Sequence, residues 1–583
     1  MRLQNLFDNL SSYGLADLFK PPGNKHLTPT PHFKKLLLIA VLAASPAVFT
    51  QTTPSPATPL PASTATSPST RLTGTLPTLG DSSELSAAAE RRIGDRIAAS
   101  IYRDPDYVDD VILSDYVQSI WQPLLASARG RGDLSPELGE RFAWDTFLIR
   151  DRSVNAFALP GGYFGVHLGL IGTVTSADEL AAVLGHELSH VTQRHISRLI
   201  TQQSRSAPWM IGAMILGALA ASKNPQAANA LIAGGQAVAA QSQLNFSRDM
   251  EREADRVGYG IMTGGGFDPR GMTSMFEKLQ QASRLNDSGG FPYLRSHPLT
   301  TERLGDAQAR FQLNSPVADK PLSSVSTPAP DSRIIHAMMA ARARVLAEPG
   351  VDTLRSAAGD GQRAGSTLNE KTAASLYGGA LAAAKLRDFK LAAALAAQLG
   401  NLMTKPGPSS ASNNTTKSSF AQAAAQLALE VELMSGTVPP GAAQFDINKV
   451  AQANQRADLL LQSRAILAGG ASGAGGRAAD VSNVSSVLLG WVNARPKDAA
   501  AWLLLAQAYG QQGKEVRAIW ADAEARAAQM DYTAALDRLK AAQSRMRSNP
   551  ASGDFMDGSI VDTRARQVEL LVREQALQDK LDR

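Results

Sequence analysis

The chain has 583 residues, of which 44% are hydrophobic and 19% charged, with eight histidines and no cysteine. This length predicts several domains, each large enough for its own hydrophobic core. The absence of cysteine excludes disulfide scaffolds, thiol catalysis and cysteine-based zinc sites, so any metal site must consist of histidines and carboxylates. The net charge is +5, and residues 1–47 carry five basic and two acidic residues, so more than half of this charge lies in that segment. The rest of the chain therefore predicts no basic face that would bind nucleic acid.

Residues 1–47 predict an export signal. The pair Lys34-Lys35 precedes the apolar run 36–44, and the small residues Ser45 and Ala47 follow at the positions of a cleavage site. This run is too short for a stable membrane span, which takes about 20 residues, and a short uncleaved anchor is the alternative. Residues 48–80 are rich in Pro, Ser and Thr and predict a disordered linker.

Residues 141–171 predict strands at 144–149, 157–159 and 163–168, the last two flanking the turn Pro160-Gly161-Gly162. An exposed strand edge can bind an extended peptide through backbone hydrogen bonds. On this reasoning the strand edge that binds substrate is expected at Phe164, Gly165 and Val166. An ordinary hairpin in the hydrophobic core is the alternative.

Residues 178–200 predict a helix that carries the motif His186-Glu187-x-x-His190. Histidines four residues apart project from one face of a helix and can share one zinc ion. Glu187 lies beside them and is expected to act as general base toward a metal-bound water. His195 would lie on the opposite face of the same helix, so we expect it to be a structural residue or to support a ligand.

A second helix, expected at 236–262, offers a third ligand. Glu251 and Asp255 lie four residues apart on one face of this helix, and Glu253 points away from that face. Glu251 is expected to bind the zinc, while Asp255 accepts the free ring N–H of a zinc-bound histidine. Without the upstream motif, a charged surface helix would be the preferred interpretation.

Residues 207–222 are apolar and uncharged, and 227–240 are rich in alanine. Sixteen apolar residues are short for a membrane span, so 207–240 predicts a helical hairpin that is buried or touches a membrane. A transmembrane hairpin is the alternative.

These motifs resemble the HtpX/Ste-type family of zinc metallopeptidases. The resemblance extends to residues 155–171 and to Ser296-His297-Pro298 with Arg303. It implies a gluzincin-type domain with one zinc ion per chain, in which Arg303 supports the site. His297 would either donate to the oxyanion of the tetrahedral intermediate or occupy the fourth zinc position and keep a resting enzyme shut.

From residue 331 onward, helical periodicity dominates, and one segment matches the 34-residue tetratricopeptide pattern. Residues 377–400 match the same tetratricopeptide pattern more loosely. Stacked helix pairs of this kind form a surface for partner proteins, and a plain helical bundle is the alternative. Asp522 and Met530 depart from the pattern, whereas the matching positions are Trp502, Leu505, Ala506, Tyr509, Ala518 and Ala525.

The predicted fold class is therefore α+β and mainly α. A gluzincin-type zinc metallopeptidase domain of helices and a small sheet is expected at 81–315. A linker follows at 316–330, and an all-α tetratricopeptide-like solenoid at 331–583.

The predicted activity is that of an exported zinc endopeptidase. With its signal and helical half, the chain most resembles the beta-barrel assembly-enhancing group of the family. That resemblance implies the periplasm of a Gram-negative bacterium, misfolded outer-membrane β-barrel proteins as substrates, their assembly machinery as partner, and peripheral membrane contact. The alternatives are a non-proteolytic chaperone or adaptor that acts through the repeats, and an integral membrane protease.

Overall fold

The computed structural model describes residues 85–203, 247–284, 291–314, 330–347, 350–404, 419–436, 445–469, 474–549 and 553–581. Residues 77–583 form one compact unit. The predicted signal (1–47), the linker 48–80 and the hairpin 207–240 lie outside the described residues, as does nearly all of the linker 316–330. In the described part of the chain, no helix is long and apolar enough to cross a membrane.

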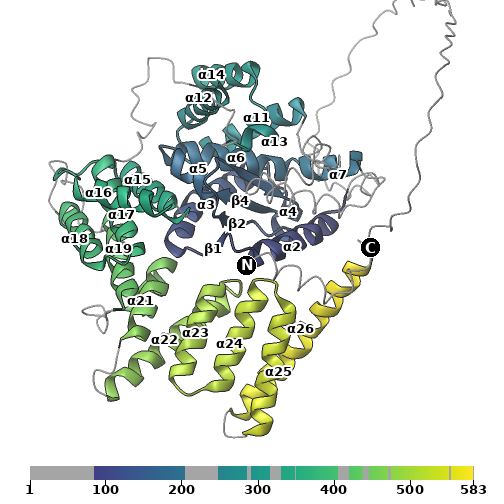
Figure 1. Cartoon of the computed structure of the whole chain (residues 1–583). Coiled ribbons are helices and arrows are strands. Elements are labelled where there is room, and N and C mark those ends of the chain that lie inside the picture. The colour runs from purple at the N-terminus through teal and green to yellow at the C-terminus, as the bar shows by residue number, and fades with distance from the viewer. Residues whose placement is uncertain are drawn as a thin grey trace, which may run out of the picture. The chain divides into compact units, whose positions relative to one another are not determined.

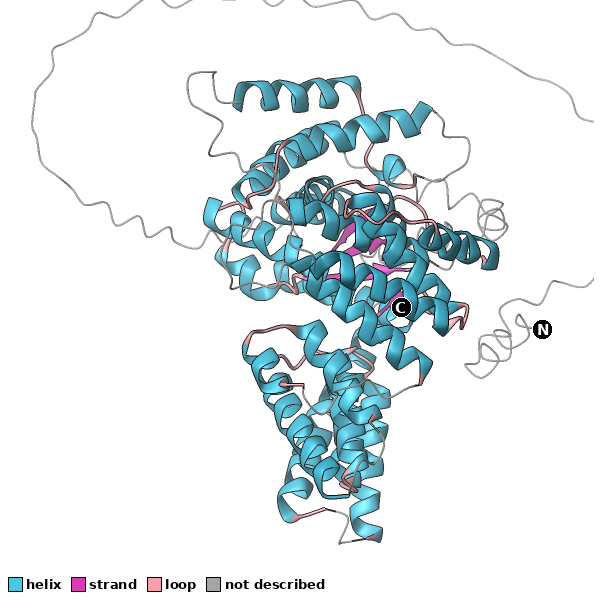
Figure 2. Ribbon diagram, turned by 90° about the vertical axis from the view of Figure 1, so that its left-hand side faces the viewer, coloured by secondary structure: helices cyan, strands magenta, loops and turns pink. Residues whose placement is uncertain are grey.

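The part of this unit up to residue 314 contains a small sheet surrounded by helices (Figures 1 and 2). The predicted class, α+β and mainly α, is confirmed. The strands are β1 (Tyr107–Val108), β2 (Asp145–Ile149), β3 (Ala156–Leu159) and β4 (Tyr163–His167). The helices are α2 (Ala87–Arg103), α3 (Val111–Arg131), α4 (Pro136–Arg141), α5 (Leu168–Thr173), α6 (Ala177–Thr192), α7 (His195–Gln203), α11 (Arg248–Gly264), α12 (Arg270–Arg284), α13 (Tyr293–Ser296) and α14 (Thr301–Asn314).

The sheet has the strand order β1-β2-β4-β3, with β4 parallel to β2 and antiparallel to β3. The turn between β3 and β4 needs two residues with positive φ, and Gly161 (75°) and Gly162 (79°) supply them without a steric penalty. The three longer strands agree with the predicted ranges to within one residue at each end.

The predicted substrate edge at Phe164, Gly165 and Val166 is wrong. These residues belong to β4, which lies between β2 and β3 and is buried along its whole length. Its backbone groups are therefore paired on both sides and cannot accept another strand. The free edge next to β4 belongs to β3, which among the described residues pairs only with β4 and packs against α6.

Helices α6 and α11 cross at very short range. A Cβ atom on Gly258 would lie 3.0 Å from the backbone N of His186, and one on Gly185 would lie 3.2 Å from the carbonyl O of Gly258. Glycine at both positions permits this approach without strain, because a Cβ atom at either would force the two backbones apart by a few tenths of an ångström. The crossing brings the N-terminal half of α11 beside the middle of α6.

The predicted continuous helix over 178–200 is broken. Helix α6 ends at Thr192, and Arg194 takes the left-handed conformation with φ 58° before α7 begins. The Arg194 guanidinium pairs with the buried carboxylate of Glu90 on α2 at 3.0 Å and also donates to the carbonyl O of Leu85. These contacts hold the turn, and the turn sets the direction of α7.

The remaining described residues are helical. In the segment that matches the tetratricopeptide pattern, α23 and α24 pack against each other, and Trp502, Leu505 and Tyr509 are buried. Assignment as a tetratricopeptide solenoid stays a prediction. The helices are α15 (Pro330–Leu346), α16 (Val351–Gln362), α17 (Glu370–Lys385), α18 (Phe389–Thr404), α19 (Ser419–Ser435), α20 (Ile447–Gln452), α21 (Arg456–Ala468), α22 (Ala474–Ala494), α23 (Ala499–Gln511), α24 (Glu515–Ala528), α25 (Tyr532–Ser548) and α26 (Phe555–Leu581).

A buried arginine joins the two halves of the described chain. Arg342 on α15 is only 1% exposed and pairs with Asp110, the N-cap residue of α3, and with Glu430 on α19 at 2.7 Å. It also donates to the hydroxyl of Tyr377 on α17. The helices after residue 330 are thus tied to α3 by charge as well as by apolar packing.

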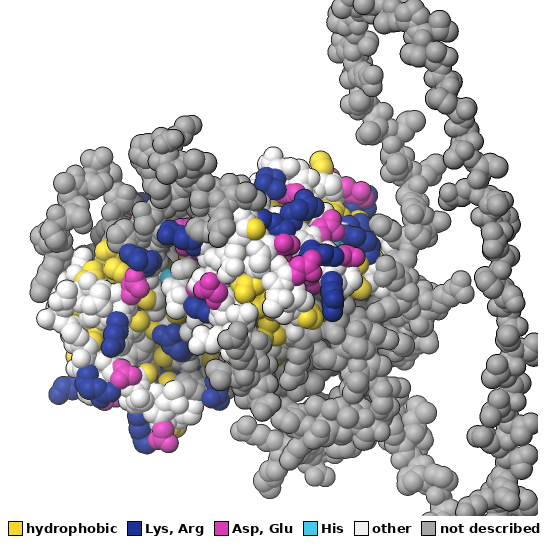
Figure 3. All heavy atoms as spheres, turned by 90° about the horizontal axis from the view of Figure 1, so that it is seen from above, with side chains coloured by type: hydrophobic (Ala, Val, Ile, Leu, Met, Phe, Trp, Pro, Cys, Tyr) yellow, Lys and Arg dark blue, Asp and Glu magenta, His cyan; other side chains and the backbone are white. Residues whose placement is uncertain are grey.

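Surface charge is mixed. On the face seen in Figure 3, basic and acidic side chains lie next to one another, with apolar side chains between them. Among the coloured, described side chains on this face, no extended region carries a single charge sign.

Replacing Arg342 by alanine should lower the free energy of unfolding by about 3 kcal/mol, because two partly buried carboxylates lose their shared cation. Urea denaturation followed by circular dichroism measures this loss. The control is Arg355→Ala, which removes an exposed pair with Asp352 and should change the free energy by less than about 0.5 kcal/mol. Equal effects of the two substitutions would contradict the role given to Arg342.

A second prediction concerns Asp115 on α3, which accepts a hydrogen bond from the backbone N–H of Ala457 at 2.8 Å. Burial raises the pKa of the Asp115 carboxyl from 3.8 to about 6. Between these values the folded state binds the proton more tightly than the unfolded chain, so this carboxyl lowers stability as the pH rises from about 4 to about 6. The stability of Asp115→Asn relative to wild type should therefore increase over that window in urea denaturation. A difference that stays constant from pH 4 to pH 7 would contradict this prediction.

Candidate metal centre

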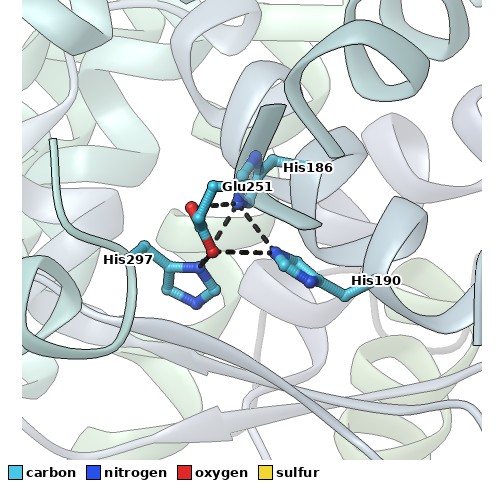
Figure 4. Close-up of side chains that lie close together, drawn as sticks. All are labelled: His186, His190, Glu251 and His297. Atoms are coloured by element: carbon cyan, nitrogen blue, oxygen red, sulfur yellow. Dashed lines mark hydrogen bonds and ion pairs between the residues drawn. The ribbon is translucent and has the colours of Figure 1, made fainter. Parts of the chain in front are cut away.

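Four buried side chains converge in the interior of the N-terminal half (Figure 4). His186 and His190 come from α6, Glu251 comes from α11, and His297 follows α13. One donor atom from each lies within 4.8 Å of the others. The Nε2 atoms of His186 and His190 are 3.0 Å apart, and each lies 3.5 Å from a carboxylate oxygen of Glu251. The structure thus brings together the three predicted metal ligands.

Helix periodicity and the glycine crossing explain this convergence. His186 and His190 are four residues apart and point to one side of α6. Ser247 caps α11, its side chain accepting from the backbone N–H of Met250, so that Glu251 lies in the first turn. The close contact at Gly185 and Gly258 then places this turn against the two histidines.

The charges of the group suit a bound cation, which would replace the proton that His186 holds. Burial, together with the charge of His186, lowers the pKa of His190 well below its usual value, so His190 is neutral and can offer a lone pair. Burial favours the neutral form of Glu251, but His297 and His186 outweigh it and hold its pKa well below the usual range. Burial also opposes the charged form of His186, yet Asp255 and Glu251 raise its pKa to about 10. The buried carboxylates of this group need a nearby positive charge to compensate for them. Two imidazoles with a carboxylate are a donor set that zinc uses.

Asp255 and Arg303 contact the candidate metal ligands. Asp255 Oδ1 lies 3.0 Å from Nδ1 of His186, on the opposite side of the ring from the metal-binding group. Arg303 donates to both oxygens of Asp255, at 2.7 and 2.8 Å, and its third nitrogen lies 2.7 Å from Glu251 Oε2. One guanidinium therefore fixes both carboxylates. The family resemblance implied that Arg303 supports the site, and the position of Arg303 agrees with that expectation.

His195 contacts the site from the other side. Its Nδ1 lies 2.9 Å from Nδ1 of His190, and its Nε2 lies 3.0 Å from Glu253 Oε2. The expectation that His195 faces away from His186 on one long helix fails, because the chain turns at Arg194. Sequence reasoning missed the part played by Glu253, which lies outside the metal-binding group but holds His195.

Glu187 is buried beside the metal-binding group. It is 1% exposed, so its carboxylate is almost completely shielded from water. Nε2 of His297 lies 3.4 Å from Glu187 Oε1. Burial raises the pKa of Glu187, although His297 and His186 oppose the shift. A carboxylate with a raised pKa takes up and returns a proton more readily near neutral pH.

His297 lies within the metal-binding group itself. Its Nδ1 is 3.0 Å from Glu251 Oε1 and 3.3 Å from Nε2 of His186. Tyr293 stacks on the His297 ring with 4.7 Å between ring centroids and an interplanar angle of 26°. Sequence reasoning missed Tyr293, although its spacing of four residues from His297 places both on one side of a helical turn.

Replacing Asp255 by asparagine should weaken metal binding by about 10- to 100-fold, because the asparagine side chain is uncharged and does not hold the His186 ring as strongly. Competition with a chromophoric zinc chelator measures the affinity. The matched control is Asp249→Asn, in the first turn of the same helix, where the side chain is 86% exposed. Unchanged affinity in Asp255→Asn would contradict its role in orienting His186.

Comparison with known proteins agrees with this geometry. The chain is 34% identical over 245 residues to the beta-barrel assembly-enhancing protease of Escherichia coli, covering 42% of this chain and 48% of the relative. It is 32% identical over 243 residues to the protein of the same name from Yersinia pestis, covering 41% and 48%. To the mitochondrial metalloendopeptidase OMA1 of Arabidopsis thaliana it is 32% identical over 164 residues, covering 28% and 31%. The chain thus spans about half the length of the bacterial relatives it matches.

Residues 116–311 match the model of peptidase family M48. The matched range contains the four converging residues together with Glu187, Asp255 and Arg303. The part of this chain that builds the candidate metal centre therefore matches peptidase family M48.

Proposed function

We propose that this protein is a zinc-dependent endopeptidase. The observation that carries the proposal is the buried convergence of His186, His190 and Glu251, with the Glu187 carboxylate beside them. Two imidazoles and one carboxylate leave a fourth position of a tetrahedral zinc ion for water or substrate. One zinc ion per chain fits this donor set.

His186, His190 and Glu251 would hold the zinc, which when bound polarises the scissile carbonyl and lowers the pKa of water. Glu187 takes a proton from the attacking water and delivers it to the leaving amine. Its burial and raised pKa suit both transfers. Asp255 and Arg303 keep His186 and Glu251 in place, so that little reorganisation is needed during the reaction.

His297 acts as a gate in this proposal. With Nδ1 next to Glu251 and His186, its ring takes the space that water or a scissile carbonyl would need. The conformation described here is therefore a resting state, and His297 must leave before substrate binds. Once displaced, it stays close enough to donate to the developing oxyanion, which is the second role expected from the sequence.

The substrate would bind along β3. This strand packs against α6, which carries the zinc ligands, and among the described residues it pairs with another strand on one side only. Backbone hydrogen bonds to a strand edge require an extended peptide but no particular sequence. Misfolded proteins offer such segments, whereas compact folded proteins do not.

The cellular function follows from the relatives and the sequence pattern. Bacterial relatives are named beta-barrel assembly-enhancing proteases, which supports misassembled outer-membrane β-barrel proteins as substrates. The predicted signal supports the periplasm of a Gram-negative bacterium, where the protein touches a membrane peripherally. The helices after residue 330, with their tetratricopeptide-like pattern, would bind the assembly machinery and assist folding as a chaperone.

Replacing Glu187 by glutamine tests the proposed activity. The variant should retain one zinc ion per chain but lose casein cleavage by about 100-fold or more, because general base catalysis is removed. Metal analysis and a fluorescent casein assay measure the two properties. The control is Glu302→Gln on α14, where the side chain is 57% exposed and both properties should persist.

Two outcomes would count against the proposal. If wild type and Glu187→Gln cleave casein equally well, Glu187 is not the general base. If both are inert and both suppress aggregation of unfolded proteins, the protein is a chaperone or adaptor.

A further inference from the structure

A cavity of about 500 Å³ lies between α15, α16 and α17, beside the turn that leads from α5 into α6. These three helices lie together on the left of Figure 1, and α15 packs against α5. The cavity shares no lining residue with the candidate metal centre. Sites for small ligands have volumes of about 300–1,000 Å³, so this space is large enough for a ligand.

Small side chains leave this space open. Helix α17 touches α15 closely, because a Cβ atom on Gly378 would lie 3.1 Å from the Cβ of Ala341. It touches α16 as closely, because a Cβ atom on Gly379 would lie 2.8 Å from the Cα of Gly361. Helices α15 and α16, in contrast, share few contacts with each other, so a gap lined by short side chains remains between them. Most of the apolar side chains that line it are alanines, namely Ala337, Ala340, Ala341, Ala357 and Ala374.

The carboxylates that line the cavity are already paired. Asp360 and Glu370 are the acidic residues among the described residues of its wall. Asp360 pairs with Arg363 at 2.6 Å, and Glu370 pairs with Arg333 at 3.3 Å. Neither of these two arginines lines the cavity. The negative charge of the wall is therefore compensated by cations that lie outside the cavity.

The cations that line the cavity, Arg344 and Lys371, pair with no carboxylate in the part of the chain that the structure describes. Arg344 donates to the carbonyl O of Gly172 on α5 at 2.7 Å, and this neutral acceptor leaves its charge uncompensated. Neighbouring atoms displace water from the guanidinium and lower the pKa of Arg344. Lys371 lies in the first turn of α17, where the helix dipole is positive as well. The cavity therefore presents a net positive charge to a ligand.

We infer that this cavity binds a carboxylate at the end of an apolar chain. The guanidinium of Arg344 pairs with the carboxylate, for which its planar group is suited, and Lys371 adds to the attraction. The apolar chain gains by leaving water and lying against the alanines. Two sources supply this chemistry, the C-terminus of a peptide with apolar last residues and a free fatty acid. The inference goes beyond the proposed endopeptidase function and does not depend on it.

Calorimetric titration compares carboxylates with neutral analogues of the same size. The ligands are acetyl-Ala-Leu-Leu with a free C-terminus, the same peptide as the C-terminal amide, octanoate and octanol. The full-length protein carries Glu187→Gln, so that no peptide is consumed during the titration. At least one carboxylate should bind about tenfold or more tightly than its neutral analogue, because the neutral analogue forms no charge-assisted pair with arginine. Binding of the peptide alone or of octanoate alone identifies the source. If neither carboxylate binds, or if each binds no better than its neutral analogue, the inference is wrong.

Two variants test whether the ligand binds in this cavity. Arg344→Gln should weaken binding of the carboxylate by about tenfold or more, whereas the control Arg355→Gln, on a side chain of α16 that is 70% exposed, should not. Ala374→Leu fills the cavity and should weaken binding of the apolar chain by a similar factor. Its matched control is Ala393→Leu, at an exposed position of α18. Circular dichroism verifies that each variant is folded. Undiminished binding in a folded Arg344→Gln or Ala374→Leu variant would overturn the inference.

Discussion

The candidate metal centre depends on the close crossing of α6 and α11 at Gly185 and Gly258. A metal ion needs its ligands within a few ångströms, and here the ligands come from helices that are more than fifty residues apart in sequence. A methyl group on either glycine would contact the other backbone at 3.0–3.2 Å. The helices would then have to separate by a few tenths of an ångström, which would move Glu251 away from His186 and His190 by a similar amount. Two residues without side chains thus set the geometry of the polar site.

The site also depends on arginines that compensate for the charge of buried carboxylates. Glu251 and Asp255 are both buried, and burying carboxylates is costly unless cations compensate for them. Arg303 serves both, and its position between them leaves one side of Glu251 directed at the histidines. Arg342 has a similar arrangement in the contact between α3 and the C-terminal helices, where one guanidinium serves Asp110 and Glu430. Both places use arginine, whose rigid planar group can bind two carboxylates at once.

The sequence predicts those features that depend on local spacing. His186 and His190 lie within a single helix, as do Glu251 and Asp255, so the face that each pair shares follows from helix periodicity. The strand ranges follow from the glycine turn and the apolar runs that flank it. The position of His195 could not be predicted in this way, because it depends on the positive φ of Arg194, which is held by α2 a hundred residues earlier. Strand order was equally inaccessible, because insertion of β4 between β2 and β3 is decided by tertiary packing.

The pair of Arg194 and Glu90 also bears on where this domain begins. The family match starts at residue 116, yet the carboxylate that neutralises Arg194 belongs to α2, upstream of that start. A fragment cut at residue 116 would leave the Arg194 guanidinium without Glu90, next to the turn that precedes His195. The contacts that hold the turn before His195 therefore extend N-terminally to residue 85, beyond the segment that matches the family model.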